Sequence, residues 1–493
     1  MEITERSLLL ERNFNSPFSN ISNSGLSVIF AVVCIVDVFG VFPVVSLPKA
    51  IIDCGYLGIL VVISVSCIQI YTAILLGKCW LMAEDIEPSI QFKNRYPYSA
   101  LAEITYGSVL ARFVTFLLDL TVFGGGIPNL IVAAQNLQFL GLRLSNDAFD
   151  MSFCYWMIVL GTVMCPFLWL GSPKDMKLLC SISVTLVFFA FIFIFICAVS
   201  DTPNQSVPSL STLPDTEFSL WQNISTAYGI LAFQFDIHPT ILTIQVDMTD
   251  KSKIDKAVIG GFAVSLGLFF ITCLTILLRY GENVEPSVLE MFPTTVILHF
   301  AAVLVALQLS LSSAISNTAL YQNIEDSMGI SRDFNRKRCI IRSILAILSV
   351  LVAESVPRFD LVMSLIGGAL TGPLVFILPP LFYIRMLTLK QKHDEMLQLE
   401  NFHNIVYNLD ETSEYFTKYI ETKFHKESNT SMPDINIVPK QQNFKDCKVI
   451  LCTLIIIFGI IATIATTYWN VINTMRYVTF SPPCIFNIYN ATL

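Results

Sequence analysis

The chain has 493 residues, of which 54% are hydrophobic and only 14% are charged, and its net charge is −8. A soluble globular chain carries about 25% charged residues, so the composition predicts an all-α integral membrane protein. The absence of a basic stripe excludes a nucleic-acid-binding protein. No nucleotide-binding loop, metal-ligand spacing or nucleophile–base pair occurs, and we therefore expect neither an enzymatic activity nor a bound metal or cofactor.

Residues 1–24 form a polar N-terminal tail before the first apolar segment. The tail contains acidic residues and lacks the basic start of a signal peptide, so we expect it on the cytosolic side. Its segment Glu5-Arg-Ser-Leu-Leu9-Leu10 resembles an acidic dileucine sorting signal. We expect the plasma membrane as the location, with an endolysosomal or vesicular membrane as the alternative.

Apolar segments of roughly the 20 residues that cross a bilayer as a helix recur along 25–470, which we interpret as one membrane domain. All but five of the 30 Lys and Arg residues lie on one side of these segments, which indicates a cytosolic N-terminus and an extracytosolic C-terminal tail at 471–493. We expect about eleven transmembrane helices, in contact with lipid. They are 27–50, 57–78, 112–138, 152–170, 179–199, 221–246, 257–278, 294–321, 339–356, 359–386 and 449–469.

The first and sixth of these segments are interrupted near their middles. Gly40 and Pro43 interrupt the first, and Asp236 and Pro239 interrupt the sixth. Irregular backbone at membrane depth is tolerated where it is buried in protein or lines a wet cavity, and two such breaks at matching positions indicate a transporter's binding site. The alternative is that the prolines only kink packed helices. The substrate-binding candidates are Gly40, Val41, Phe42 and Val44 in the first segment and Phe233, Asp236, Ile237 and Thr240 in the sixth.

Ionisable side chains inside membrane segments are candidates for ion coupling, because an isolated charge there is costly. Asp37 lies beside the first break. Asp119 lies about two turns into the third segment, where a salt bridge with Arg112 is the alternative. His238 would titrate near physiological pH, unless it is a neutral histidine hydrogen-bonded to backbone.

Two long loops and one short loop carry further signals. The segment 79–111 is long enough for an amphipathic cytosolic helix, and 387–447 is a cytosolic loop whose first part favours helix. In the expected topology Asn204 is the favoured glycosylation acceptor and Asn490 is a second one near the chain end. Three cysteines face outward and leave a disulfide pairing open: Cys54, Cys154 and Cys484.

Four motifs follow one another in the order expected of a known transporter family. They are Val45-Ser-Leu-Pro-Lys-Ala50, Tyr96 to Gly107, Phe233 to Met248 and Leu365 to Ile384. Together they resemble the amino acid/auxin permease family, which contains the proton-coupled, system A/N and vesicular inhibitory amino-acid transporters. The resemblance implies a five-plus-five inverted repeat of the leucine-transporter type, with broken helices 1 and 6 and an eleventh helix appended. It also places Ser312 and Ser313 where relatives with this fold supply hydroxyls to sodium, unless these serines only pack helices.

One departure from the family pattern affects the first break. Where the family usually has glycines before Leu-Pro, this chain has Val41-Phe42-Pro43, and Pro43 has no N–H to offer a carboxylate. We expect secondary active transport of amino acids or related small zwitterions by alternating access, with a proton favoured over sodium as the coupling ion. The alternative is a non-transporting amino-acid sensor that signals through 387–447.

Overall fold

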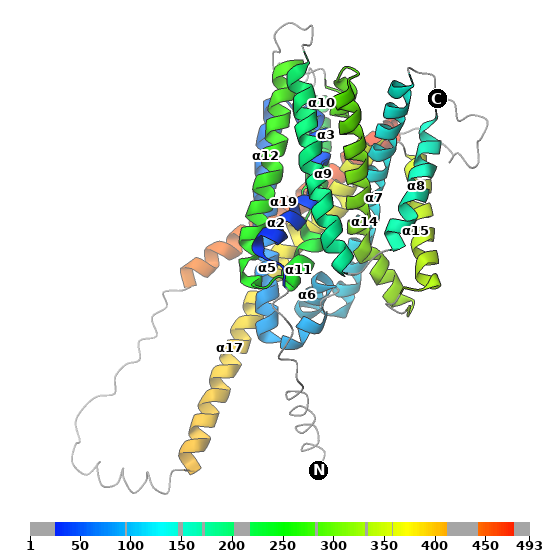
Figure 1. Ribbon diagram of the computed structural model, residues 1–493. Helices are drawn as coiled ribbons and strands as arrows, with labels where there is room; N and C mark the ends of the chain where they lie inside the picture. Colours follow the sequence, from blue (N-terminus) through cyan, green and yellow to red (C-terminus); the bar gives the residue numbers. More distant parts are fainter. Residues whose placement is uncertain are drawn as a thin grey trace, which may run out of the picture.

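The computed structural model describes residues 25–93, 96–145, 151–169, 173–201, 217–281, 284–330, 334–356, 358–411 and 442–477. These residues are almost entirely helical, and their single β contact is an isolated parallel bridge between Leu26 and Met248. The helices form a bundle from which α17 extends away (Figure 1).

The N-terminal half comprises α2 (Val28–Phe39), α3 (Phe42–Val45), α4 (Leu47–Ile52), α5 (Tyr56–Ile86), η1 (Pro88–Lys93), α6 (Pro97–Tyr106), α7 (Ser108–Leu144), α8 (Phe153–Trp169) and α9 (Pro173–Ser200). The second half comprises α10 (Glu217–Gln234), α11 (His238–Asp247), η2 (Lys251–Lys253), α12 (Ile254–Tyr280), α13 (Val288–Met291), α14 (Val296–Ser327), α15 (Arg336–Ser355), α16 (Phe359–Ile366), η3 (Gly367–Thr371), η4 (Pro373–Ile377), α17 (Leu378–Glu411) and α19 (Gln442–Tyr477).

Seven helical stretches in the described residues are long and apolar enough to cross a membrane. Large apolar side chains on them face outward, with Phe116, Ile271 and Leu454 being 61%, 47% and 58% exposed, as lipid contact requires. The all-helical membrane fold is therefore confirmed. The count of eleven spans stays a prediction, because the other four positions hold helices that are shorter, broken or more charged. The seven stretches are Tyr56–Ile86, Ser108–Leu144, Leu178–Ser200, Lys251–Tyr280, Val296–Ser327, Phe359–Glu400 and Cys447–Arg476.

The first span is broken where the sequence predicts it, at Gly40. This glycine has φ 62° and ψ −156°, a conformation that side chains with a Cβ rarely adopt. Two glutamines from other spans satisfy two of the freed backbone groups. The Val41 N–H donates to Oε1 of Gln308 at 3.1 Å, and Nε2 of Gln234 donates to the Phe39 carbonyl at 2.6 Å. The break is thus held open by side-chain hydrogen bonds.

The sixth span is broken between the end of α10 and the start of α11. Pro239 stands in the first turn of α11, where its missing N–H costs no hydrogen bond. The His238 N–H donates to Oδ1 of Asp236 at 3.0 Å, and Nε2 of Gln69 on α5 donates to the Ala232 carbonyl at 3.0 Å. Side chains therefore replace helical hydrogen bonds here too, as in the first span.

The tenth span contains an irregularity that the sequence analysis did not predict. Two π-helical turns, η3 and η4, follow α16, and Pro373 at the start of η4 removes one helical donor. The neighbouring backbone is in close contact: a Cβ on Gly229 of α10 would overlap the Ser364 carbonyl, and one on Gly367 would overlap the Gly229 carbonyl. Small residues allow this approach of α10 to α16.

Two predicted loops contain helix. The segment 79–111 holds α6, and α17 continues through Glu411 into the predicted loop 387–447. Lys390 on this extension pairs with Asp85 at 2.7 Å, which fixes α17 to the end of α5. The tail 1–24, both glycosylation candidates and residues 478–493 lie outside the described residues.

A buried ion cluster joins α14, α15 and α8. The guanidinium of Arg342, which is fully buried, contacts both carboxylate oxygens of Glu325, with its Nε 2.5 Å from Oε1, and donates to the Leu168 carbonyl at 2.7 Å. Removing one partner of a buried pair leaves an uncompensated charge, whereas the intact pair contributes little net stability.

We therefore expect Arg342→Met to destabilise the protein by about 3 kcal/mol or more, since Glu325 would remain buried without its main partner. The exposed Arg336→Met on the same helix is the control and should leave the melting temperature nearly unchanged. Thermal unfolding of the two variants in detergent measures the difference. Equal melting temperatures would show that the cluster does not hold these helices together.

Candidate functional site

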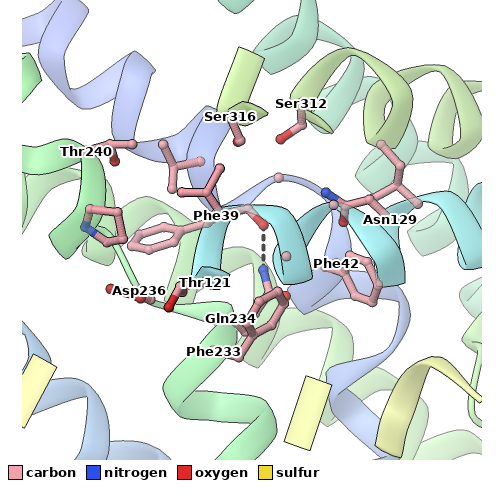
Figure 2. A pocket seen from close by; sticks show the side chains of 17 residues that line it. Phe39, Phe42, Thr121, Asn129, Phe233, Gln234, Asp236, Thr240, Ser312 and Ser316 are labelled. Carbon is pink, nitrogen blue, oxygen red and sulfur yellow. Dashed lines mark hydrogen bonds between the residues drawn. The ribbon is translucent and has the colours of Figure 1, made fainter. Parts of the chain in front are cut away.

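A small cavity with a volume of about 100 Å³ lies between the two breaks. Its walls come from the first break, the middle of α7, the sixth break and α14. In Figure 2, Ser312 and Ser316 of α14 lie on the side opposite to Asp236 and Gln234. The lining residues are Val38, Phe39, Gly40, Phe42, Thr121, Val122, Gly125, Gly126, Asn129, Phe233, Gln234, Asp236, Pro239, Thr240, Leu309, Ser312 and Ser316.

The structure brings five of the eight substrate-binding candidates to the cavity. Val41, Val44 and Ile237 are not among its lining residues, and all three are buried. Val41 and Ile237 instead accept backbone hydrogen bonds that start α3 and α11. Their contribution is to hold the break in shape. The candidates that line the cavity are Gly40, Phe42, Phe233, Asp236 and Thr240.

The sequence analysis missed the wall that α7 contributes. Thr121, Gly125, Gly126 and Asn129 of α7 line the cavity, and a Cβ on Gly125 would lie 3.3 Å from the Phe233 ring. The run Gly124-Gly-Gly126 was the available signal, because consecutive glycines in a membrane helix mark a place of close approach. Gln234 and Ser316 were also missed, since neither differs in type from many polar residues in the other helices.

Both breaks leave backbone groups at the cavity. Within the described residues no hydrogen bond is found for the Phe42 N–H or for the carbonyls of Val38 and Gly40, and all three residues line the cavity. Pro43 supplies no second N–H beside Phe42. The first break therefore presents one free donor and two free acceptors.

Asp236 is the only charged residue in the cavity lining. Its side chain is 4% exposed, Oδ1 lies 3.3 Å from Nδ1 of His238, and Oδ2 has no partner among the described residues. On its other face the His238 ring lies 3.0 Å from the Thr72 hydroxyl, through Nε2. The predicted contact of His238 with nearby backbone is thus replaced by two side-chain contacts.

Asp37 and the two serines of α14 lie behind the first break. The Ser312 hydroxyl donates to the Asp37 carbonyl at 3.1 Å, so Ser312 both lines the cavity and satisfies the end of α2. The buried Asp37 carboxyl is hydrogen-bonded to Ser183 on α9 and does not line the cavity. Ser313 accepts from Nδ2 of Asn317 at 3.3 Å within α14.

Asp119 accepts a hydrogen bond from Nδ2 of Asn323 on α14. No ion pair joins Asp119 to Arg112 in the described part of the chain, so the alternative of a salt bridge along the third span is wrong. Asp119 is absent from the cavity lining, although Thr121 and Val122 nearby belong to it. An Asp119 relay would therefore act from outside the cavity.

Cys154 at the start of α8 is disulfide-bonded, whereas Cys54 is free and buried. Of the three outward-facing cysteines predicted, Cys54 is thus not a member of a disulfide. An apolar helical bundle whose two interrupted spans face one small cavity of mixed polar and apolar lining is the architecture of a membrane transporter.

Comparison with known sequences gives the family. A family model described as "Transmembrane amino acid transporter protein" matches residues 25–408. The chain belongs to this family, and the resemblance drawn from its four motifs is confirmed. The chain is a secondary transporter of amino acids, and its relatives carry transporter names rather than enzyme names.

Several curated relatives match at similar identity. Amino acid transporter AVT1J of Arabidopsis thaliana is 24% identical over 352 residues, covering 70% of this chain and 79% of the relative. For AVT1B of the same plant the identity is 24% and the coverage 70% and 62%. Sodium-coupled neutral amino acid symporter 2 of Danio rerio is 26% identical over 241 residues, covering 44% of this chain and 47% of the symporter.

Solved structures are more distant. A mutant manganese transporter of Eremococcus coleocola is 14% identical, with a TM-score of 0.43, and the match covers 91% of this chain and 94% of that chain. A sodium-coupled sialic acid symporter has a TM-score of 0.40 at 13% identity, covering 70% of this chain and 79% of that one. The family assignment rests on the sequence match.

Proposed function

We propose that the protein carries small zwitterionic amino acids through the cavity between its two breaks, by alternating access, coupled to a proton. The observation that carries the proposal is the pair of free groups at opposite breaks. The Oδ2 atom of Asp236 is free to accept from an ammonium group, and the Phe42 N–H is free to donate to a carboxylate. A zwitterion offers both charges on one small molecule.

The proposed site has fewer carboxylate donors than the family pattern implies. Pro43 stands where a glycine N–H is usual, so Phe42 alone offers an amide at this turn, and no Lys or Arg lines the cavity. The ammonium end should thus be held more firmly than the carboxylate end. Amino acids whose carboxylate is esterified should therefore compete for the site almost as well as the free acids.

Sodium is the second candidate for the coupling ion. A relative from Danio rerio is a sodium-coupled symporter by name, and the free Val38 carbonyl and the Ser312 hydroxyl face the same cavity. Sodium needs several oxygens held together around it, whereas a proton needs one acid–base group beside the cavity, and we favour the proton. Uptake into vesicles with the pH and sodium gradients imposed independently tests this: the pH gradient alone should drive accumulation. Accumulation that requires sodium and ignores pH would contradict proton coupling.

The non-transporting sensor remains the alternative from a different class of function. The extension of α17 beyond the bundle (Figure 1) is the observation that favours it, because such a helix offers surface to a cytosolic partner. A sensor would bind amino acids without moving them. Equilibrium binding to purified protein together with absence of flux in reconstituted vesicles would favour it over transport.

We further propose that the N-terminus is cytosolic and that the protein resides in the plasma membrane. The asymmetry of Lys and Arg predicts this orientation. Asn204 should then carry a glycan. Asn20 and Asn429 also match the Asn-X-Ser/Thr sequon, but this orientation places both in the cytosol, where they should stay unmodified. Gel mobility before and after glycosidase treatment, with Asn204→Gln as the variant that abolishes the shift, checks the prediction. A glycan on Asn429 would invert the orientation.

A further inference from the structure

The imidazole of His238 is held between two oxygens that come from different helices. Its Nδ1 lies 3.3 Å from Oδ1 of Asp236 at the cavity, and its Nε2 lies 3.0 Å from the hydroxyl of Thr72 on α5. The ring is fully buried. In this arrangement Nδ1–H donates to the carboxylate. A second proton on the ring would therefore bind at Nε2.

The Thr72 hydroxyl can serve His238 in both of its protonation states. Its oxygen also lies 2.9 Å from the Ile68 carbonyl one turn earlier. When the ring is neutral, the hydroxyl donates to Nε2. When the ring carries a second proton, the hydroxyl rotates, donates to Ile68 and accepts from Nε2–H. A buried group that keeps its hydrogen bonds on protonation avoids the added cost of an unsatisfied polar atom.

The charge of the cavity then depends on this one proton. Asp236 is its only charged lining residue, so a bound zwitterion leaves the buried site with one net negative charge, which is costly at membrane depth. We propose that His238 gains one proton at Nε2 when a zwitterion enters the cavity and releases it when the substrate leaves on the other side, and that this proton balances Asp236 while the zwitterion is bound. This inference rests on the function proposed above and names the group that couples proton to substrate.

The other titratable groups on the elements around α11 have hydrogen-bond or ion-pair partners other than His238. From α6, Tyr98 is near Asp236 but donates its hydroxyl to the Leu374 carbonyl of η4 at 2.7 Å. From α2, Asp37 faces Ser183 of α9. From η2, Lys251 pairs with Glu84 of α5 at 2.5 Å. On α7, the acid close in sequence to the cavity lining is Asp119, which is bonded to Asn323.

The test uses two substitutions at Thr72, one that keeps the hydroxyl and one that removes it. Thr72→Ser keeps a group that can accept from Nε2–H, and Thr72→Val removes it at similar volume. Hydrogen bonds from a charged donor are stronger than those between neutral groups, so Thr72→Val should disturb the charged His238–Asp236 pair more than Thr72→Ser does. The ratio of uptake of a mixture of radiolabelled neutral amino acids at pH about 5.5 to that at about 7.5 should fall in Thr72→Val and keep its wild-type value in Thr72→Ser.

His238→Gln supplies the second variant, with His299→Gln on α14, away from the cavity, as the matched control. The ratio of uptake at pH about 5.5 to that at about 7.5 should fall to about 1 in His238→Gln and keep its wild-type value in His299→Gln. A wild-type ratio in His238→Gln, or equal ratios for the two Thr72 variants, overturns the inference and leaves Asp119 as the relay.

A binding measurement separates this inference from the proposed transport. Adding the same neutral amino acids to the detergent-solubilised full chain in weakly buffered solution should cause proton uptake from the medium, and Thr72→Val should reduce the number of protons taken up. This result would support the inference even for a protein that transports nothing. Binding without proton uptake overturns it, even if transport is observed.

Discussion

Thr240→Trp is expected to abolish amino-acid uptake while the protein still folds and reaches the membrane. Thr240 lines the cavity in the first turn after the sixth break, and an indole there would fill space that the substrate needs. The Thr240 side chain is partly exposed and lies at the cavity rather than in the packed core, so the larger side chain should be accommodated without unfolding the helix. Uptake per unit of surface-labelled protein is the measurement.

The matched control lies three residues further along the same helix. Thr243 is exposed on the outer surface of α11, so Thr243→Trp introduces the same side chain without entering the cavity. Its uptake should be close to the wild-type value. Normal uptake in Thr240→Trp would show that the break in the sixth span is structural only.

Gly40→Ala is expected to reduce uptake severely. At φ 62° and ψ −156° a residue with a Cβ is strained by about 1–3 kcal/mol. In addition, the new Cβ would lie 3.0 Å from Nε2 of Gln308, whose Oε1 satisfies the Val41 N–H. Displacing this glutamine frees a backbone donor and changes the turn that presents Phe42 to the cavity.

Gly107→Ala separates strain from the loss of this contact. Gly107 also has positive φ, 89°, but a Cβ there would meet nothing within 4 Å. This variant should lose some stability and keep its uptake per folded molecule. Comparison of melting temperature and initial uptake rate in the two variants decides the point. Equal uptake in both would mean that the contact with Gln308 has no part in transport.

The outline of the fold could be predicted from the sequence because lipid imposes one strong constraint. Uninterrupted apolar runs gave helices such as α5, α12 and α14 close to the expected segments, and Gly40 with Pro43 marked the first break correctly. The π-helical turns after α16 could not be predicted in this way. They depend on the contact between Gly229 and Gly367, which lie in different spans.

The site residues next to helix-breaking prolines could be predicted from the sequence. The site residues whose role depends on contacts between helices could not. Phe42, Asp236 and Thr240 adjoin prolines that break a helix, and all three line the cavity. Gln234 and Gln308 lie within apolar spans, and their role as partners of the first break appears only when α10 and α14 are placed beside α2. Sequence spacing within one helix does not report contacts between helices.

The measurement that tests the central claim most directly is counterflow of radiolabelled amino acids in proteoliposomes without any ion gradient. Vesicles loaded with an unlabelled mixture of neutral amino acids should accumulate external label transiently with the wild-type chain, and the signal should disappear with Thr240→Trp but persist with Thr243→Trp. This result would show that substrate crosses the membrane through the cavity between the two breaks. Binding of the label with no counterflow in the wild-type protein, or undiminished counterflow in Thr240→Trp, would contradict the account.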